Sequence, residues 1–216
     1  MTTPDTHRRQ RRKDARPAEL AAAAMALFVE KGFAATRLDD VASRAGVSKG
    51  TLYLYFDSKE ALFRSVIEES IVPMIGEVEA MVERLGDDPV RLLRALLEFW
   101  WAQIGSTHLA GTCKLMLCEA GNFPEVAMYL NERVIGPWHM LLNRVIEAGM
   151  TKGVFRQGNP ESVRQMVFYP LLMQAVWQCS LPVCSSARPM PENYFDTFFD
   201  VLFRGLLVEP SEETQR

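Results

Sequence analysis

The chain has 216 residues, of which 48% are hydrophobic and 24% are charged, and its formal net charge is −3. This length and composition allow one large domain or two modest ones with a substantial core. Charges, prolines or glycines interrupt every apolar run before the roughly 18 to 20 residues that a bilayer span needs, and no apolar segment follows the Arg-rich N-terminus. We therefore expect a cytoplasmic protein that is neither exported nor embedded in a membrane.

The charge is unevenly distributed along the chain. Residues 1–66 carry 12 Lys and Arg against 8 Asp and Glu, a formal charge of +4, whereas residues 67–216 carry 12 against 19, or −7. Positive charge concentrated in one part of a chain is typical of a segment that meets a polyanion. Residues 1–16 combine six basic side chains with almost nothing apolar, and we expect them to form a disordered basic arm.

Three short helical patterns follow the arm. Apolar side chains recur at helical spacing from Pro17 until Gly32, which predicts a first helix. Thr36 is placed to cap a short second helix, and Gly46 can take the left-handed conformation that ends it. Ser48 then caps a third helix. Two short helices joined by a tight glycine turn constitute a helix-turn-helix.

The third helix spans about residues 48–56. Leu52 and Phe56 lie four residues apart and face inward, which turns the polar residues of the helix outward or to its flanks. Gly50 lowers helix propensity by about 1 kcal/mol relative to alanine, which suggests the close approach of a partner backbone. Simple tolerance of glycine near a helix start is the alternative.

The rest of the chain predicts only helices. Asp57 or Ser58 opens a fourth helix that runs toward Pro73 and leaves the small N-terminal part. Glycine, asparagine and proline punctuate the segments that follow. Further helices are expected near residues 74–85, 89–105, 111–121, 125–149, 161–180 and 192–208.

The segment from Lys31 to Leu62 resembles the N-terminal signature of the TetR family of bacterial transcriptional regulators. The matching residues are Lys31-Gly32-Phe33, Thr36, Val41-Ala42 and the continuous run from Ala45 to Leu62. The resemblance is specific because helix caps, the turn glycine and the outward positions match in one register. It covers about the first 45 to 50 residues after the arm.

This resemblance implies a set of residues that contact operator DNA. They are Thr36, Arg37, Ser48, Lys49, Gly50, Thr51, Tyr53, Tyr55 and Lys59. Lys59 and Tyr55 are expected to bind phosphates, whereas Lys49, Thr51 and Tyr53 can reach base edges. Without the family context, Tyr53 and Tyr55 would be interpreted as ordinary surface side chains. Residues 8–16 could add phosphate or minor-groove contacts, and a purely solubilising tail is the alternative.

The expected fold is all-α: an N-terminal three-helix helix-turn-helix domain joined by a long helix to a larger helical ligand-binding and dimerisation domain. The expected boundaries are an arm at 1–16, a DNA-binding domain at 17–63, a ligand-binding and dimerisation domain at 64–210, and a tail at 211–216. Apart from Phe123-Pro124-Glu125, which looks like a common family element, the second domain is variable in this family and identifies no ligand.

Methionine and aromatic side chains are frequent in the second domain, and they make adaptable apolar walls for a flat or apolar ligand. The residues predicted to line a pocket are Met74, Phe99, Trp100, Trp101, Gln103, Met116, Phe123, Trp138, His139, Tyr169, Met173 and Trp177. Core packing is the alternative for each of them. Neighbours on a helix point about 100° apart, so the Trp100 and Trp101 rings are not expected to share one core face.

The last helix has a broader apolar face than docking alone requires. Together with the helix at 161–180, which Pro170 should bend, it resembles the four-helix dimer interface of the family. The predicted interface residues are Met166, Pro170, Gln174, Phe195, Phe198, Phe199, Leu202 and Phe203. A two-fold dimer places two recognition helices on two half-sites, so the operator should be palindromic.

Other kinds of site find little support in the sequence. The cysteines form two pairs with a spacing of five, Cys113 with Cys118 and Cys179 with Cys184, which fits neither facing neighbours on a helix nor common zinc sites. We expect inert thiols, no metal and no cofactor. The alternative is a thiol-based redox sensor, or a site formed by His108, Cys113, Cys118 and His139. The three histidines have no carboxylate or nucleophile at motif spacing, so an enzyme is not expected.

The function predicted from the sequence is a transcriptional regulator acting on the nucleoid in the cytoplasm. A repressor would bind its operator as a homodimer and be released by a small apolar or aromatic effector, and an activator would use the same DNA contacts. A different class of function is the alternative: a ligand-independent or architectural DNA-binding protein, since a helix-turn-helix dimer needs no effector to bind DNA.

Overall fold

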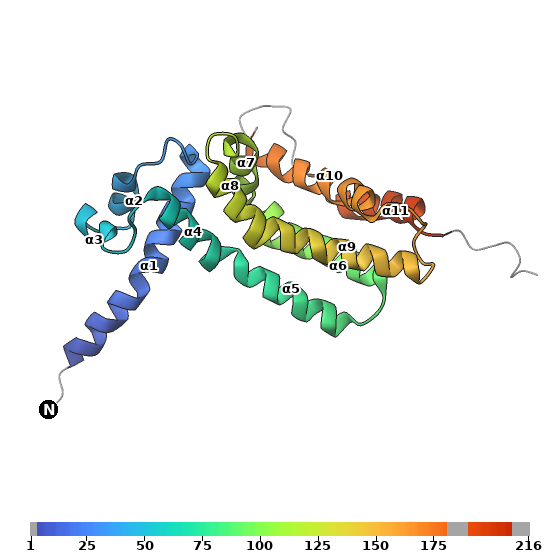
Figure 1. Ribbon diagram of the computed structural model, residues 1–216, viewed down its shortest axis with the longest axis horizontal. Helices are drawn as coiled ribbons and strands as arrows, with labels where there is room; N and C mark the ends of the chain where they lie inside the picture. The colour runs from blue at the N-terminus through green and yellow to red at the C-terminus, as the bar shows by residue number, and fades with distance from the viewer. Residues whose placement is uncertain (1–3, 181–189, 209–216) are drawn as a thin grey trace, which may run out of the picture. The chain divides into compact units, whose positions relative to one another are not determined.

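The computed structural model describes residues 4–180 and 190–208, with side chains from Pro17 onward. Within these ranges the chain contains no β-strand, and its one isolated β-bridge joins Phe155 to Leu207. The predicted all-α fold is confirmed (Figure 1). The helices are α1 (Pro4–Lys31), α2 (Leu38–Arg44), α3 (Lys49–Tyr53), α4 (Lys59–Ser70), α5 (Val72–Leu85), α6 (Pro89–Trp100), α7 (Ala110–Glu119), α8 (Pro124–Leu130), α9 (Gly136–Thr151), α10 (Pro160–Ser180) and α11 (Tyr194–Leu206), with π-helical segments η1 (Trp101–Gly105) and η2 (Asn131–Ile135).

The first helix begins earlier than the sequence predicts. Residues 4–16 are helical and continuous with the rest of α1, where a disordered arm was expected. Arginine, lysine, glutamine and alanine are strong helix formers, so a polar segment of this composition can extend a helix that is anchored further along. Pro17 lies inside α1 without ending it. The predicted tail at 211–216 and Cys184 lie outside the described residues.

The chain divides into two compact units that do not follow the predicted boundary near residue 63. Unit 1 comprises Met1–Gly76 and Gly111–Ile135, and unit 2 comprises Glu77–Ala110 and Gly136–Arg216. The sequence pattern predicted contiguous domains, whereas α7 and α8 return to pack on the N-terminal helices. At Gly111 an added Cβ would lie 2.6 Å from Cγ1 of Val29, which shows how closely α7 approaches α1.

An aromatic cluster forms the centre of unit 1. Phe28, Phe33 and Phe63 are fully buried, with ring centroids of Phe28 and Phe33 5.2 Å apart and those of Phe33 and Phe63 5.6 Å apart. Phe123, at the α7–α8 corner, adds an edge-to-face contact to Phe33 at 4.8 Å. Such pairs contribute about 0.5–1.5 kcal/mol each beyond their burial, so this cluster fixes α1, α4 and the α7–α8 corner together.

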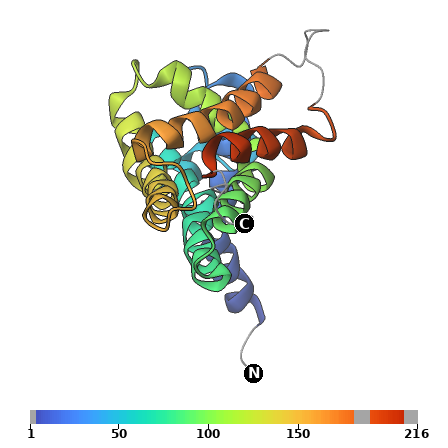
Figure 2. The ribbon, with the colours of Figure 1, turned by 90° about the vertical axis from the view of Figure 1, so that its right-hand side faces the viewer.

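Unit 2 is built on the antiparallel pair α9 and α10, which a short turn connects. α10 packs on α9, and the two views together show that the helices cross at an angle (Figures 1 and 2). The ring of Phe168 on α10 lies 4.9 Å from the ring of Trp100 on α6 and 5.9 Å from that of Trp138 on α9. Aromatic packing therefore joins three helices of this unit.

Candidate nucleic-acid interface and effector pocket

The turn between α2 and α3 has the features of a helix-turn-helix. Gly46 has a φ of 65°, the left-handed conformation that glycine adopts without steric cost. Ser48 is the N-cap of α3, and its Oγ accepts a hydrogen bond from the backbone N–H of Thr51 at 3.1 Å. Leu52 is fully buried and Phe56 nearly so. These inward contacts fix which side of α3 faces solvent.

Most of the predicted DNA contacts lie together on this outer side of α3. Ser48, Lys49, Gly50 and Tyr53 are exposed, while Thr51 and Tyr55 are half-buried at its flanks. A Cβ added at Gly50 would meet only Oγ of Ser48, at 3.9 Å. Gly50 therefore lies on an open surface, which a DNA backbone or base edge could approach closely.

Lys49 is held in place by its neighbours in the absence of DNA. Its Nζ lies 2.9 Å from an Asp39 carboxylate oxygen and 5.9 Å from the ring centroid of Tyr53. The hydrogen bond to Asp39 raises the pKa of Lys49. Because an exposed ion pair contributes little to stability, a DNA phosphate or base can compete for this ammonium group. Arg37, the N-cap residue of α2, is also exposed.

The position of Thr36 does not fit its predicted role as a DNA contact. Its side chain is buried, and its Oγ1 donates toward the backbone oxygens of Gly32 at 2.7 Å and Leu27 at 3.2 Å. A hydroxyl committed to the end of α1 is not available to DNA. We therefore assign Thr36 the role of positioning α2 relative to α1.

Lys59 is also engaged within the protein. Its Nζ donates to the carbonyl oxygens of Phe33 at 2.6 Å and Ala34 at 3.1 Å, and lies 4.5 Å from the ring centroid of Phe33. Burial lowers the pKa of Lys59. An ammonium group has three donors, so one remains for a phosphate. Lys59 thus positions the α1–α2 segment as well as being a candidate phosphate ligand.

Leu54 is an interface candidate that the sequence analysis missed. It follows Tyr53 at the C-cap of α3, and 82% of its surface is exposed. A leucine is ordinarily assigned to the core. Position 54, however, lies between the inward positions of Leu52 and Phe56, and this helical register could have predicted that Leu54 faces outward. A leucine on the recognition helix can contact thymine methyl groups in the major groove.

We predict that Leu54 reads such a methyl group. Replacing one thymidine in one half-site by deoxyuridine at the contacted position removes one methyl group, and the affinity of the parent protein should fall about fourfold, the value of burying one methylene-sized group. Leu54→Ala should bind both duplexes equally. Anisotropy titrations with each thymidine replaced in turn provide the test, and an undiminished uridine effect in Leu54→Ala would contradict the assignment.

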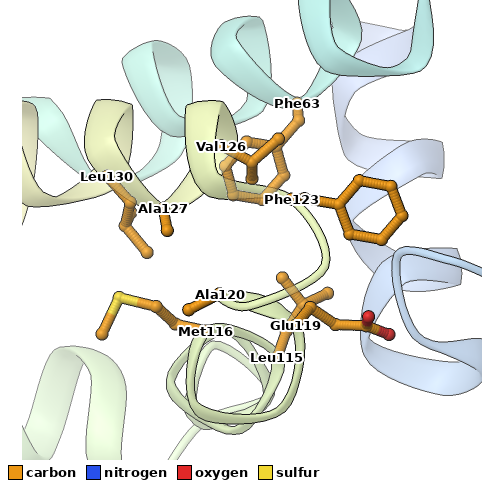
Figure 3. Close-up of a pocket in the computed structure, with 9 residues that line it drawn as sticks. All are labelled: Phe63, Leu115, Met116, Glu119, Ala120, Phe123, Val126, Ala127 and Leu130. Atoms are coloured by element: carbon orange, nitrogen blue, oxygen red, sulfur yellow. The ribbon is translucent and has the colours of Figure 1, made fainter.

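The described pocket in unit 1 contains only two of the predicted pocket residues. Its lining comes from α4, α7, α8 and the corner between α7 and α8: Phe63, Leu115, Met116, Glu119, Ala120, Phe123, Val126, Ala127 and Leu130. Figure 3 shows apolar side chains facing each other across the gap, with the Glu119 carboxylate at one edge. The central space measures about 10 Å³, enough for about one water molecule. A larger molecule requires side chains to move.

The two consecutive tryptophans are both buried, each against a different helix. The Trp100 ring packs on Phe168 of α10 at 4.9 Å, and the Trp101 ring packs on Phe195 of α11 at 5.7 Å. The expected divergence of the two rings is present, but both directions lead to packed aromatic neighbours. Trp138 is likewise buried, whereas Met74, Phe99 and His139 are half-buried and Gln103 is exposed.

Tyr169, Met173 and Trp177 were predicted to line the pocket, but they lie on the surface of α10. They share one exposed stripe with Met166, which is 78% exposed, and Pro170. The spacing of three and four residues places all of them on one helix face. Helical periodicity identifies a shared face but not what covers it, which is why the sequence assigned these residues to a pocket.

The predicted interface residues on α11 do not share one environment. Phe199 and Phe203 are buried within unit 2, and the Arg94 guanidinium lies over the Phe199 ring at 4.0 Å. These two phenylalanines belong to the core of the unit. Four other predicted interface residues are half-buried: Gln174 on α10, and Phe195, Phe198 and Leu202 on α11.

Within the described ranges, no group of three His, Cys, Asp or Glu side chains is arranged to hold a metal ion. In the same part of the chain, no helix is both long enough and apolar enough to cross a membrane.

Comparisons with known proteins agree with the geometry of the N-terminal helices. Residues 20–66 match the family model described as bacterial regulatory proteins, tetR family. The regulator EthR of Mycolicibacterium smegmatis is 38% identical over 122 residues, 52% of this chain and 56% of EthR. The chain thus aligns with only about half the length of this relative. The repressor KstR2 of Rhodococcus jostii is 31% identical over 144 residues, 67% of this chain and 70% of KstR2.

Solved structures extend the likeness of fold to nearly the whole chain. The regulator FadR of Bacillus subtilis, solved with stearoyl-CoA, superimposes with a TM-score of 0.67 at 18% identity, covering 87% of this chain and 98% of FadR. FadR of Bacillus halodurans gives a TM-score of 0.69 at 22% identity, covering 87% and 94%. With the identity and coverage shared with KstR2, these findings establish that the chain belongs to the TetR family of bacterial transcriptional regulators.

Proposed function

We propose that the protein is a transcriptional repressor of the cytoplasm that binds a palindromic operator as a homodimer and is released by a small apolar or aromatic effector. The observation that carries the DNA-binding part is the outer surface of α3. Capped by Ser48 and anchored by Leu52, it presents Lys49, Gly50 and Tyr53 to solvent on one side. A short helix with such a surface fits the major groove.

The exposed stripe on α10 supports the homodimer. Met166, Tyr169, Pro170, Met173 and Trp177 form an apolar surface of the kind that subunit interfaces bury. A second copy would cover the same stripe on both subunits around a two-fold axis. Phe198 and Leu202 on α11 are candidates to extend this contact.

A charged cluster in unit 1 offers a route from the effector to the DNA-binding helices. Glu68 on α4 accepts hydrogen bonds from Nε of Arg133 at 2.7 Å and from the hydroxyl of Tyr129 at 2.6 Å. These partners lower the pKa of Glu68 to about 2, so its carboxylate is ionised at neutral pH. A movement of α8 or η2 would be passed to α4 through these contacts. DNA and effector must then weaken each other's binding by the same factor.

The test is a fluorescence anisotropy titration of purified protein with labelled DNA from upstream of its own gene, against a scrambled duplex at physiological salt. A specific regulator should bind the upstream DNA at least about 1,000-fold more tightly than the scramble. If no duplex from that region or its neighbouring promoters binds better than the scramble, and binding to all is steeply salt-dependent, the protein is an architectural DNA binder instead.

A further inference from the structure

The buried polar atoms that lack a hydrogen-bond partner are concentrated in one helix pair of unit 2. In the part of the chain whose side chains are described, they are Nε and Nη1 of Arg164 on α10, and Nε1 of Trp138 and Oδ1 of Asn143 on α9. A buried donor or acceptor without a partner is destabilising, and a charged donor is more so. Native proteins seldom retain such groups without a reason, so this cluster indicates a missing binding partner.

Arg164 is the centre of this cluster. Its side chain is only 5% exposed, and among the side chains that the structure describes, the one carboxylate within ion-pair distance is that of Glu161, whose Oε1 lies 3.6 Å from Nη2. At that distance the contact is weak, and Glu161 is itself largely solvent-exposed. The remaining guanidinium nitrogens, Nε and Nη1, have no acceptor. One buried cation is thus only partly compensated.

Contacts between α9 and α10 bring Trp138 and His139 into the neighbourhood of Arg164. Trp138 and His139 on α9 contact Phe168 on α10, with ring centroids 5.9 Å and 6.2 Å apart. Arg164 lies one turn before Phe168 on α10, and its charge contributes to lowering the pKa of His139. Arg164, Trp138 and His139 therefore belong to one locus, which aromatic rings bound on one side.

We propose that this locus binds the head group of the effector, that the head group is a carboxylate held by Arg164, and that the effector is an aryl or alkyl monocarboxylate. The proposal rests on the proposed function and names the chemical class of its effector. The planar guanidinium donates to a planar carboxylate with matching geometry. Trp138 and Phe168 supply apolar surface for the body of the molecule.

The charges at the locus favour a monoanion over a phosphate dianion. Arg164 supplies one positive charge, and Glu161 offsets part of it. Burial, with a smaller contribution from Arg164, lowers the pKa of His139 to about 4, so His139 is neutral at physiological pH. A second negative charge would find no cation here.

The locus is closed in this structure, which gives the ligand a means of switching the protein. The orphan atoms are shielded from solvent, so a carboxylate enters only when α9 and α10 separate locally. The ligand then binds the separated form and not the closed form, and such differential affinity is what a shift of conformational population requires.

The test compares benzoate, phenylacetate and decanoate with their neutral amides and with phenyl phosphate. Binding is followed by tryptophan fluorescence and by release of labelled operator from the full-length dimer. The carboxylates should bind at least about tenfold more tightly than the amides, a difference of about 1.4 kcal/mol, and also more tightly than phenyl phosphate. Arg164→Met should abolish this preference, so that the acids and their amides bind with similar affinity. Replacing a partly compensated buried charge by an apolar side chain is often neutral or stabilising, so this variant should fold.

Arg144→Met, at an exposed position on α9, is the matched control and should retain the preference. Equal binding of acids and amides by the parent protein, or a preference that survives in Arg164→Met, overturns the proposal. Loss of the dimer in Arg164→Met, measured by analytical ultracentrifugation, also overturns it, because Arg164 would then pair with the second copy. Operator binding is also measured on the same samples without any of these test ligands. A protein that does not bind its operator would contradict the proposed function, independently of the result for the ligands.

Discussion

Gly50→Ala should make the protein more stable and at the same time a weaker operator binder. Gly50 lies inside the short helix α3, where alanine is favoured by roughly 0.5–1 kcal/mol. The added Cβ meets nothing closer than Oγ of Ser48, so the fold accommodates it. Where α3 enters the major groove, the same methyl group occupies space that DNA would fill. We expect operator affinity to fall at least about tenfold, and further in Gly50→Leu.

Gly76→Ala is the matched control for this experiment. Gly76 is exposed within α5, and a Cβ there meets no atom within 4 Å. It should gain similar helix stability without changing operator affinity. Thermal unfolding and anisotropy titrations measure the two properties separately. A Gly50→Ala protein that binds the operator as tightly as the parent would show that α3 does not approach DNA at this position.

Phe63→Ala should have the largest effect on stability. Phe63 is fully buried, in contact with the rings of Phe28 and Phe33, and it also forms one wall of the pocket in Figure 3. Removing a buried phenylalanine ring costs about 3–5 kcal/mol, because both its burial and its packing disappear. For a protein of this size the melting temperature should fall by roughly 10 °C. Phe63→Leu, which keeps most of the volume, should be destabilised much less.

The same variant tests the character of the pocket. The space vacated by the ring adjoins an apolar cavity, and apolar cavities of benzene size remain dry and bind small aromatic molecules. Toluene should therefore raise the melting temperature of Phe63→Ala but not that of the parent protein or of Met128→Ala, an exposed position on α8. Calorimetry with and without toluene measures this. A Phe63→Ala protein that melts at the same temperature as the parent would contradict the central role of the aromatic cluster.

The local structure of the helix-turn-helix could be predicted from the sequence because local interactions decide it. Ser48 caps α3, Gly46 makes the turn, and Leu52 anchors the helix, as the pattern of these residues indicated. Caps, turn glycines and helical periodicity act within a few residues, so they can be recognised without tertiary information. The family resemblance rests on the same short segment.

The role of single side chains within that segment was less predictable. Thr36 and Lys59 have residue types suited to DNA, yet backbone carbonyls of the protein accept their hydrogen bonds. Leu54 has a residue type suited to a core, yet it is exposed. Donors and apolar groups bind whichever partner the fold brings within reach, and residue type alone does not identify that partner.

The sequence by itself determined the helical class, the positions of most helices, the helix-turn-helix and the family, since each follows from patterns spanning a few turns of helix. Only the tertiary structure decided that residues 111–135 pack with the N-terminal helices, that Trp100 and Trp101 are both buried, and that Trp177 faces outward. It alone brought Arg164 on α10 close to His139 on α9. The reason is that helical periodicity defines which residues share a face, whereas burial and pairing depend on contacts between segments far apart in the chain.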